Sequence, residues 1–288
     1  MNPKLANWGL FFILTLIWGS SFILMKEGLK ELSAYEVATI RILSAGIILL
    51  PFALKGFREI QYKDMGKVLA SGLLGSFFPA ILFCLAETQI DSALAGMLNA
   101  LTPLFVIIIG FLVFQSSVQL KKIVGVAIGF CGMLLLFFSK DVNTTNNNLL
   151  YSSLIIAATV CYGINVNLVS RYLKHIGSLN LAAVSFGFLI VPSAILLYLL
   201  GFFNHSFSNK TILISSGASI TLGVFGTAIA SIFFYMLMKR AGPLFSSMVT
   251  YGIPFVAVFW GLLAGETVSA LQVLGLIVIL TGVYITNR

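Results

Sequence analysis

The segment NALTPLFVIIIGFLVF, residues 99–114, has a counterpart 151 positions later, TYGIPFVAVFWGLLAG, residues 250–265. Each segment is a long apolar run with a polar residue followed, four positions later, by a proline. Such a proline is tolerated in a membrane helix because neighbouring groups satisfy the freed backbone. The pair therefore indicates a membrane protein built from repeated segments.

The composition supports a membrane protein. Of the 288 residues, 59% are hydrophobic and only 9% are charged, whereas about a quarter of an ordinary soluble domain is charged. A membrane helix needs roughly 20 mostly apolar residues, so the apolar runs predict an all-α membrane protein with ten transmembrane helices. The predicted spans are residues 5–25, 35–54, 66–86, 92–114, 121–138, 149–170, 179–203, 212–238, 243–264 and 269–286.

The basic residues are scattered between the apolar runs. The net charge is +8, but a nucleic-acid partner would require Lys and Arg clustered on one water-facing surface, so we expect none. With the N-terminus inside, 12 of the 17 Lys and Arg residues are cytoplasmic, four are outside and Arg41 is within a span. Because Lys and Arg accumulate in cytoplasmic loops, the sequence predicts a multi-pass inner-membrane protein with both termini in the cytoplasm.

The repeat extends beyond the two proline segments. Spans three to five align with spans eight to ten, and Trp18-Gly19 of the first span aligns with Tyr162-Gly163 of the sixth. We therefore expect two five-helix domains, residues 1–140 and 149–288. Because five is odd, the second domain enters the membrane from the opposite side, which gives an inverted repeat around a central cavity, as in many secondary transporters. A duplicated scaffold without transport is the alternative.

Several short motifs together resemble the EamA-type transporters of the drug/metabolite transporter superfamily, over nearly the whole chain. These motifs are Trp18-Gly19-Ser20-Ser21-Phe22 with Lys26, Arg41, Asn99-Ala100-Leu101-Thr102-Pro103-Leu104, Pro254 and Gly265-Glu266. The resemblance implies ten helices, cytoplasmic termini, a central cavity and export of amino acids or other small metabolites. One position departs from the family pattern: Gln115 stands where an acidic residue commonly closes the fourth span, although its counterpart Glu266 is present.

Polar and aromatic residues at mid-span are the candidates for a solute site, because polar groups facing lipid are costly. By the two repeat offsets, Trp18 and Tyr162 correspond, as do Ser21 and Asn165, and Asn99 and Thr250. We predict that seven residues bind substrate: Trp18, Ser21, Asn99, Tyr162, Asn165, Thr250 and Tyr251. Tyr235, Phe78 and Trp260 are further candidates for aromatic walls. For the residues of the first and sixth spans, the alternative is a packing role with interhelical hydrogen bonds.

The two mid-span prolines supply a physical mechanism. A proline inside a helix deprives the carbonyl four residues earlier of its partner, so Pro103 frees the carbonyl of Asn99 and Pro254 that of Thr250. We predict that both prolines are hinges for alternating access and that the freed carbonyls help to form the solute site. The alternative is a tolerated kink whose carbonyl is satisfied by a neighbouring helix.

Charged residues are predicted at two depths. Arg41 is expected about 9 Å from the outer face, at 1.5 Å per residue, where it is a candidate charged contact for substrate. A carboxylate ligand, a path outward to water and a helix end to hold are the roles open to it. The charges near the outer ends are expected to form a solvated surface; they are Lys26, Glu27, Lys30, Glu31, Glu87 and Asp91.

The sequence favours transport over catalysis. It shows no nucleophile with a base or metal cluster, no metal-ligand spacing among its three cysteines and no phosphate-binding Gly-x-x-x-x-Gly-Lys loop. We therefore expect no cofactor, no metal and no enzymatic activity. The leading hypothesis is a secondary transporter, an exporter or facilitator of small polar metabolites with amino acids favoured. The alternatives are a drug or amphipathic-compound exporter, supported by 13% aromatic residues, and a membrane scaffold or enzyme. The predicted partners are a small solute and the lipid bilayer, and the oligomeric state is left open.

Overall fold

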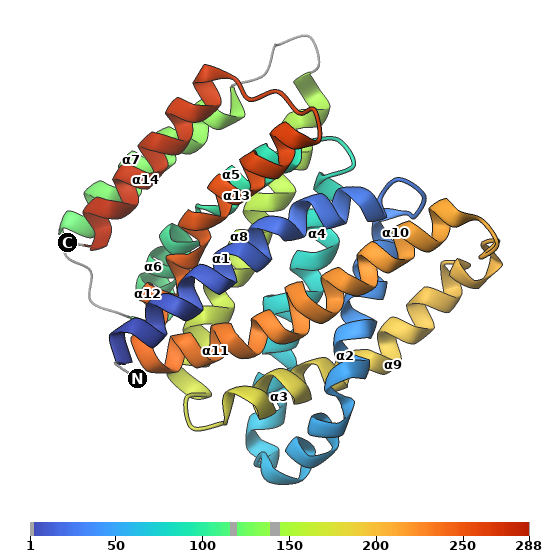
Figure 1. Ribbon diagram of the computed structural model, residues 1–288. Coiled ribbons are helices and arrows are strands. Elements are labelled where there is room, and N and C mark those ends of the chain that lie inside the picture. The colour runs from blue at the N-terminus through green and yellow to red at the C-terminus, as the bar shows by residue number, and fades with distance from the viewer. Residues whose placement is uncertain (1–2, 116–119, 139–144, 288) are drawn as a thin grey trace.

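The computed structural model describes residues 3–115, 120–138 and 145–287, and all regular structure within these ranges is helical (Figure 1). The α-helices are α1 (Pro3–Gly28), α2 (Ala34–Glu59), α3 (Tyr62–Gly72), α4 (Phe78–Ala86), α5 (Ser92–Asn99), α6 (Thr102–Leu112), α7 (Leu120–Phe137), α8 (Thr145–Tyr172), α9 (Ser178–Leu199), α10 (Lys210–Thr221), α11 (Ala230–Ala241), α12 (Pro243–Ser247), α13 (Val249–Leu263) and α14 (Ala270–Asn287). Two π-helical segments, η1 (Leu73–Phe77) and η4 (Leu222–Ile229), and a short 3-10 helix, η3 (Phe202–Asn204), complete the described structure.

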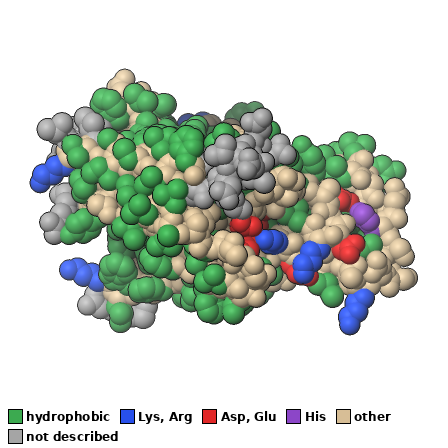
Figure 2. Space-filling model, turned by 90° about the horizontal axis from the view of Figure 1, so that it is seen from above, with side chains coloured by type: hydrophobic (Ala, Val, Ile, Leu, Met, Phe, Trp, Pro, Cys, Tyr) green, Lys and Arg blue, Asp and Glu red, His purple; other side chains and the backbone are tan. Residues whose placement is uncertain are grey.

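Eight helical stretches of the described chain are long and apolar enough to cross a membrane. Four are single helices, and four are composites in which two helices join end to end, directly or through a π segment. Two further helices, α7 and α14, hold shorter apolar stretches, Val124–Leu136 and Ala270–Gly282. Hydrophobic side chains spread over much of the face seen in Figure 2. The chain is therefore an all-helical, multi-pass membrane protein, and the count of ten crossings stays a prediction.

A capping box fixes the start of α2. The Ser33 hydroxyl accepts a hydrogen bond from the Glu36 amide (3.3 Å), and the Glu36 carboxylate accepts one from the Ser33 amide (2.8 Å). This reciprocal pair satisfies two amides that a helix start leaves without partners. The other Glu36 oxygen lies 2.8 Å from His205 Nε2, which ties the helix start to the loop after η3. About two turns further on, the same helix carries Arg41.

Helices α1 and α8 make equivalent contacts in the bundle. Helix α1 packs against α13 where Gly19 faces Val256, and α8 packs against α6 where Gly163 faces Phe105. A Cβ at Gly19 would lie 2.8 Å from Val256 Cγ1, and one at Gly163 would lie 2.9 Å from the Phe105 carbonyl carbon. Glycine is therefore what allows both close approaches. Phe105 and Val256 are separated by the same 151 residues as the two proline segments.

The π segments also stand at equivalent places. In η1, Gly75 lies against Asn165 of α8, and in η4, Gly226 lies against Ser21 of α1. A Cβ at Gly75 would come 2.9 Å from Asn165 Cγ, and one at Gly226 would come 2.7 Å from Ser21 Oγ. The sequence predicted uninterrupted helices here, because apolar runs carry no sign of a π turn. Such segments are rare and frequently mark functional sites.

The two proline-containing spans are both irregular, but in different ways. Helix α5 ends at Asn99, and Pro103 stands in the first turn of α6, where a proline costs no helical hydrogen bond. Pro254 instead lies inside α13, and the break in this span comes earlier, at Met248 between α12 and α13. The hinge role of the two prolines stays a prediction.

Helices α7 and α14 form a pair at one side of the bundle (Figure 1). Glycines let their backbones approach closely: a Cβ at Gly132 would lie 2.6 Å from the Ile279 amide nitrogen, and one at Gly282 would lie 2.5 Å from the Gly125 carbonyl oxygen. Small residues at such crossings are typical of helix association in membranes. The pair therefore stands beside the eight longer stretches, which enclose the core.

Candidate functional site

A small cavity lies at the centre of the bundle, and helices from both halves of the sequence line it. Its walls come from α1, α2, η1 and α4 to α6 in the first half, and from α8 and η4 to α13 in the second. The volume is about 90 Å³, which corresponds to roughly six water molecules. The cavity can therefore hold a small metabolite.

Six of the seven residues predicted to bind substrate line this cavity: Trp18, Ser21, Asn99, Tyr162, Asn165 and Thr250. The seventh, Tyr251, is not among the lining residues; it is half-buried and packs against the hydrophobic core. Of the suggested aromatic walls, Tyr235 lines the cavity. Phe78 is 44% exposed, and Trp260 Nε1 donates a hydrogen bond to Ser20 Oγ (2.9 Å).

The residues of α1 and α8 also hold the helices together. Trp18 Nε1 donates a hydrogen bond to the Gly226 carbonyl of η4 (3.0 Å). On the other side, Asn165 Oδ1 accepts one from Ser71 Oγ (2.7 Å), which itself lies 3.1 Å from the Tyr235 hydroxyl. The two proposed roles, cavity lining and interhelical bonding, are thus combined in the same side chains. Helix-to-helix bonds of this kind fix the orientation of the groups that face the cavity.

The carbonyl freed by Pro103 has a partner close by. Thr102 Oγ1 donates a hydrogen bond to the Asn99 carbonyl oxygen (2.8 Å), so the protein satisfies this group within the broken span itself. In the second half, Thr250 Oγ1 donates to the Ser247 carbonyl oxygen (2.8 Å). Thr102, Ser247 and Thr250 all line the cavity. The two irregular spans therefore bring hydroxyl groups, as well as backbone, to the cavity wall.

Arg41 reaches the cavity from α2 and is only 9% exposed. Its Nε donates a hydrogen bond to Thr227 Oγ1 (2.6 Å), and its Nη1 lies 3.8 Å from the Met25 sulfur. Thr227 Oγ1 also donates to the Leu222 carbonyl (3.3 Å) within η4, so the π segment holds the hydroxyl that positions the guanidinium. Within the described part of the chain, no carboxylate forms an ion pair with Arg41. Arg41 therefore faces the cavity, and the choice among its three predicted roles stays open.

The wall of the cavity has a distinct chemical character. It combines hydroxyl groups such as Ser76 and Ser231, the amides of Asn99 and Asn165, and aromatic rings, and Arg41 is the one charged side chain among the described residues that line it. Within the described ranges, no group of three or more His, Cys, Asp or Glu side chains is arranged to hold a metal ion. The wall can therefore bind a small polar solute through hydrogen bonds and one positive charge.

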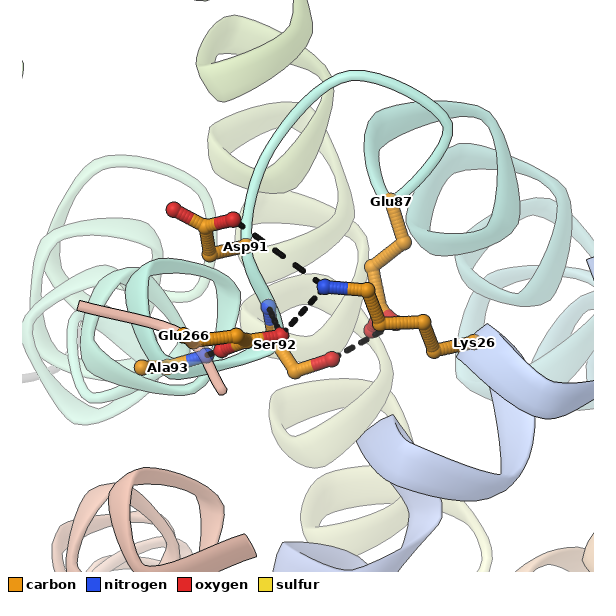
Figure 3. Close-up of polar contacts among 6 residues, drawn as sticks. All are labelled: Lys26, Glu87, Asp91, Ser92, Ala93 and Glu266. Carbon is orange, nitrogen blue, oxygen red and sulfur yellow. Dashed lines mark hydrogen bonds and ion pairs between the residues drawn. The ribbon is translucent and has the colours of Figure 1, made fainter. Parts of the chain in front are cut away.

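A second polar site, which we call the Lys26 cluster (Lys26, Glu87, Asp91 and Glu266), is drawn in Figure 3. It lies at the end of α1 that is remote from the N-terminus (Figure 1). Lys26 Nζ lies 2.5 Å from Glu266 Oε1 and 4.0 Å from Asp91 Oδ1. The Glu266 carboxylate also accepts hydrogen bonds from the amides of Ser92 (3.1 Å) and Ala93 (3.0 Å). Glu266 therefore caps the N-terminus of α5 and pairs with Lys26 of α1. In this way, a residue of the second half joins two helices of the first half.

Glu87 lies directly after α4 and is 5% exposed. Its Oε2 accepts a hydrogen bond from Ser92 Oγ (3.4 Å). Burial raises the pKa of this carboxyl well above the ordinary value, and the nearby Glu266 charge raises the pKa further. Glu266, and not Glu87, is the carboxylate in direct contact with Lys26.

The Lys26 cluster corrects the expectation that these charges form a solvated surface. Lys30 and Glu27 do form an exposed pair (2.5 Å, 62% and 35% exposed side chains), but Glu87 is only 5% exposed. The side chain of Glu266, with which Lys26 pairs, is only 3% exposed. Glycine at position 261 makes room for the Glu266 carboxylate, because a Cβ there would come 2.5 Å from Glu266 Oε2. That contact joins residues five positions apart across a turn with Gly265 at φ +83°, and helical periodicity does not indicate it.

The fold and the cavity together define a class: a polytopic helical membrane protein with a small central cavity whose wall carries both apolar and polar groups, which is the architecture of a transporter. The chain belongs to the EamA-like transporter family, whose model matches residues 7–138 and 149–288. The resemblance noted in the sequence is thus confirmed. The family model matches twice, once up to residue 138 and once from residue 149 onward.

Curated relatives cover almost the whole chain. An "Uncharacterized transporter" of Archaeoglobus fulgidus is 25% identical over 285 residues, which is 99% of each chain. The "Uncharacterized inner membrane transporter YedA" of Escherichia coli K12 is 26% identical over 293 residues, covering 98% of this chain and 91% of the relative. These names describe transporters and do not state a substrate.

A solved structure, described as "Crystal structure of protein", resembles the chain with a TM-score of 0.66. The similarity covers 97% of this chain and 96% of the other, at 15% sequence identity. It shows a shared fold.

Proposed function

We propose that the chain is a secondary carrier, an exporter or facilitator, that moves a small polar metabolite across the inner membrane by alternating access. The observation that carries this proposal is the central cavity, because residues of both halves line it at positions related by the repeat. Amino acids are the first substrate class to test, since their size matches the cavity. The family and the names of its relatives are those of transporters.

The carrier would consist of ten membrane crossings in two inverted domains, residues 1–140 and 149–288. The paired contacts support this architecture: Gly19 on Val256 repeats Gly163 on Phe105, and the two π segments meet α1 and α8 at equivalent glycines. In such repeats, one half rocks against the other around a fixed central site. The shorter apolar stretches of α7 and α14 would provide the fifth and tenth crossings.

Alternating access requires contacts between the halves that form in one state and break in another. The Lys26 cluster supplies such a contact at one end of the bundle, because Lys26 belongs to the first half and Glu266 to the second. If the termini are cytoplasmic, as the distribution of basic residues favours, this end faces outward. The arrangement described here then has its outer end held shut, and Pro103 and Pro254 are the bending points for opening it.

The orientation has its own test. A cysteine introduced at Lys63 should be protected from an impermeant thiol reagent in intact cells, whereas one at Lys210 should react, in a background without native cysteines. Both positions are exposed, so burial does not explain a difference. Labelling at Lys63 and protection at Lys210 would reverse the orientation.

A drug or amphipathic-compound exporter is the second candidate, and the aromatic wall favours it. Trp18, Tyr162 and Phe234 line the cavity, and aromatic faces bind organic cations. The positive charge of Arg41 in the same wall opposes a cationic ligand. Protection of cells against toxic organic cations without any metabolite flux would favour this candidate.

The direct experiment is a metabolite screen of flux in proteoliposomes that contain the purified protein. We expect saturable transport of a small metabolite, and we expect Trp18→Ala to reduce it by at least about tenfold through loss of cavity contacts. Trp8→Ala is the matched control, because Trp8 is on the same helix but 46% exposed. A wild-type protein that inserts but moves no solute would contradict the proposal. Equal flux in the two tryptophan variants would contradict the site.

A further inference from the structure

The guanidinium of Arg41 is buried beside a cavity with only neutral partners. Thr227 accepts a hydrogen bond from Nε, and the Met25 sulfur, a weak acceptor, is the neighbour of Nη1. Arginine stays protonated in proteins and carries five N–H donors. No described carboxylate lies within ion-pair distance of this side chain, and most of its donors have no described partner. The nearby carboxyl of Glu87 senses the Arg41 charge only as the smallest of the influences on its pKa.

A buried charge in this state is costly. Intramembrane charges pair with one another or face a water-filled cavity, and removal of a charge from water without compensation costs far more than burial of a neutral polar group. The chain does pair Lys26, although the side chain of this cation is 36% exposed, because Lys26 contacts the carboxylate of Glu266. The difference indicates that Arg41 is kept available for a group that the protein does not supply.

The local structure presents one edge of the guanidinium. With Nε held by Thr227, the edge formed by Nη1 and Nη2 is the one that remains, and this edge can bind both oxygens of a carboxylate. The π segment η4 holds Thr227, and Gly223 of the same segment lies where a Cβ would come 2.5 Å from the Arg41 carbonyl oxygen. Two contacts with η4 therefore fix the position of Arg41: Gly223 packs against its backbone, and Thr227 accepts the hydrogen bond from its Nε.

The rest of the wall offers no negative charge to a cation. Among its described residues, the lining contains hydroxyl, amide and aromatic groups and no carboxylate. A solute with one negative charge would make the occupied cavity neutral, a zwitterion would leave it at +1, and a cation would raise it to +2. The aromatic rings of Trp18 and Tyr162 provide a surface for an apolar body.

We propose, on the basis of the carrier function above, that Arg41 binds the carboxylate of the transported solute and that this carrier selects small organic acids. The carboxylate is required, and a free amino group is dispensable. A 2-oxo acid of about the size of an amino acid therefore binds at least as well as the amino acid itself. The corresponding amide or amine does not bind.

Binding in detergent tests the inference separately from transport. Two matched series serve as probes, one built on leucine and one on phenylalanine, each with the 2-oxo acid, the amino acid, the amino amide and the amine that lacks the carboxyl group. Thermal stabilisation of the purified protein is measured as a function of probe concentration. We expect the acids of at least one series to bind about 10- to 100-fold more tightly than the amide and the amine, because a hydrogen bond to a charged group has this effect.

Three variants assign the effect to Arg41. Arg41→Gln should weaken the acid by the same factor and bring it level with the amide, and Arg41→Lys should keep part of the preference because it keeps the charge but not the two-pronged geometry. Arg58→Gln is the matched control, since Arg58 is exposed on the same helix. Without probe, Arg41→Gln should melt at or above the temperature of the wild type, because it removes a buried unpaired charge. A purely structural arginine would give a lower melting temperature and no change in acid preference.

The outcomes distinguish the two proposals. Preference for the acids that Arg41→Gln removes, with no flux in proteoliposomes, would support the anion site and contradict the carrier. Flux of a neutral or cationic solute that Arg41→Gln leaves unchanged would overturn the anion site and leave the carrier intact. Equal binding of acid and amide, or no binding by any probe, would also overturn the anion site.

Discussion

Two cations of the first half, Lys26 and Arg41, are withdrawn from water in different ways. Lys26 lies at the end of α1 within 4.0 Å of two carboxylates, and its partner Glu266 is contributed by the second half. Arg41 lies beside the central cavity with a hydroxyl and a thioether as its neighbours. One charge is neutralised by the protein, and the other is not. We infer that the first joins the two halves and the second is available to a ligand.

The two cations would have different functions in transport: Arg41 would select the solute, and the Lys26 cluster would gate the outer end. A buried ion pair contributes little net stability, because desolvation offsets its attraction. Loss of one partner alone is nevertheless costly, because it leaves the other charge buried and unpaired. An unpaired guanidinium costs stability until a ligand neutralises it. The low dielectric constant of the membrane interior strengthens interactions between charges. The same effect would therefore favour binding of an anion beside Arg41 and pairing of Lys26 with Glu266.

The largest effect is expected at the cavity. Arg41→Gln should reduce flux of a carboxylate solute by about 10- to 100-fold, because a hydrogen-bonded charge pair with the solute is lost. Initial rates in proteoliposomes measure it, with Arg58→Gln at the wild-type rate as the control. A rate within a factor of two of the wild type, at equal protein in the liposomes, would remove the distinction between the two cations.

The Lys26 cluster should show the next largest effect, and on accessibility rather than on binding. Glu266→Gln weakens the pairing with Lys26 and the cap of α5, which should shift the equilibrium toward the outward-open state by about 2 kcal/mol, or roughly 30-fold. This is less than for a fully buried pair, because the Lys26 side chain is 36% exposed. Reaction of a cysteine at Ser76 with an external thiol reagent measures the shift, after replacement of Cys84, Cys131 and Cys161.

The exposed Glu31 provides the control for that experiment. Glu31→Gln removes a charge near the same end of the bundle without touching the Lys26 cluster, and surface pairs contribute about 0 to 1 kcal/mol. Equal rates of labelling in the two glutamine variants would show that net charge, and not the contact between halves, controls access. Slower labelling in Glu266→Gln than in the wild type would contradict the gating role.

The two prolines should differ in their effects. Pro254→Ala restores a hydrogen bond inside α13 and can stabilise that helix by up to about 3 kcal/mol, so it should slow transport several-fold while raising thermal stability. Pro103→Ala changes a first-turn position, where proline is tolerated, and should have a smaller effect. Wild-type flux and unchanged accessibility in a stable double alanine variant would rule out the hinge.

Glu87 should give the smallest effect on transport at neutral pH. Because burial raises the pKa of its carboxyl, the folded protein holds a proton that the unfolded chain releases above the ordinary glutamate pKa. Stability should therefore fall as pH rises from that ordinary value toward the raised one, and Glu87→Gln should lessen this decline. Melting curves across pH measure it, and flux at pH 7 should stay within about twofold of the wild type. A decline of equal steepness in both proteins would contradict the raised pKa of Glu87.

The sequence predicted much of the fold and part of the site. Apolar runs located the helices, and the offset between Trp18 and Tyr162 identified residues that line one cavity, because a membrane helix can bury polar groups only toward the protein interior. Tyr251 is not among the residues that line it, since adjacent residues on a helix point in different directions, and its role in binding stays a prediction. The π segments and the Lys26 cluster were missed, because they depend on contacts between segments far apart in the chain.

Counterflow in proteoliposomes tests the account most directly. The vesicles are loaded with the unlabelled acid that binds most tightly in detergent, and uptake of the same labelled acid is followed in the wild type, Arg41→Gln and Arg58→Gln. A carrier with a single central site exposed alternately to each side should show faster labelled uptake when unlabelled solute is inside. We predict this acceleration in the wild type and in Arg58→Gln and its loss in Arg41→Gln. Uptake that is insensitive to internal solute, or acceleration that persists in Arg41→Gln, would contradict the account.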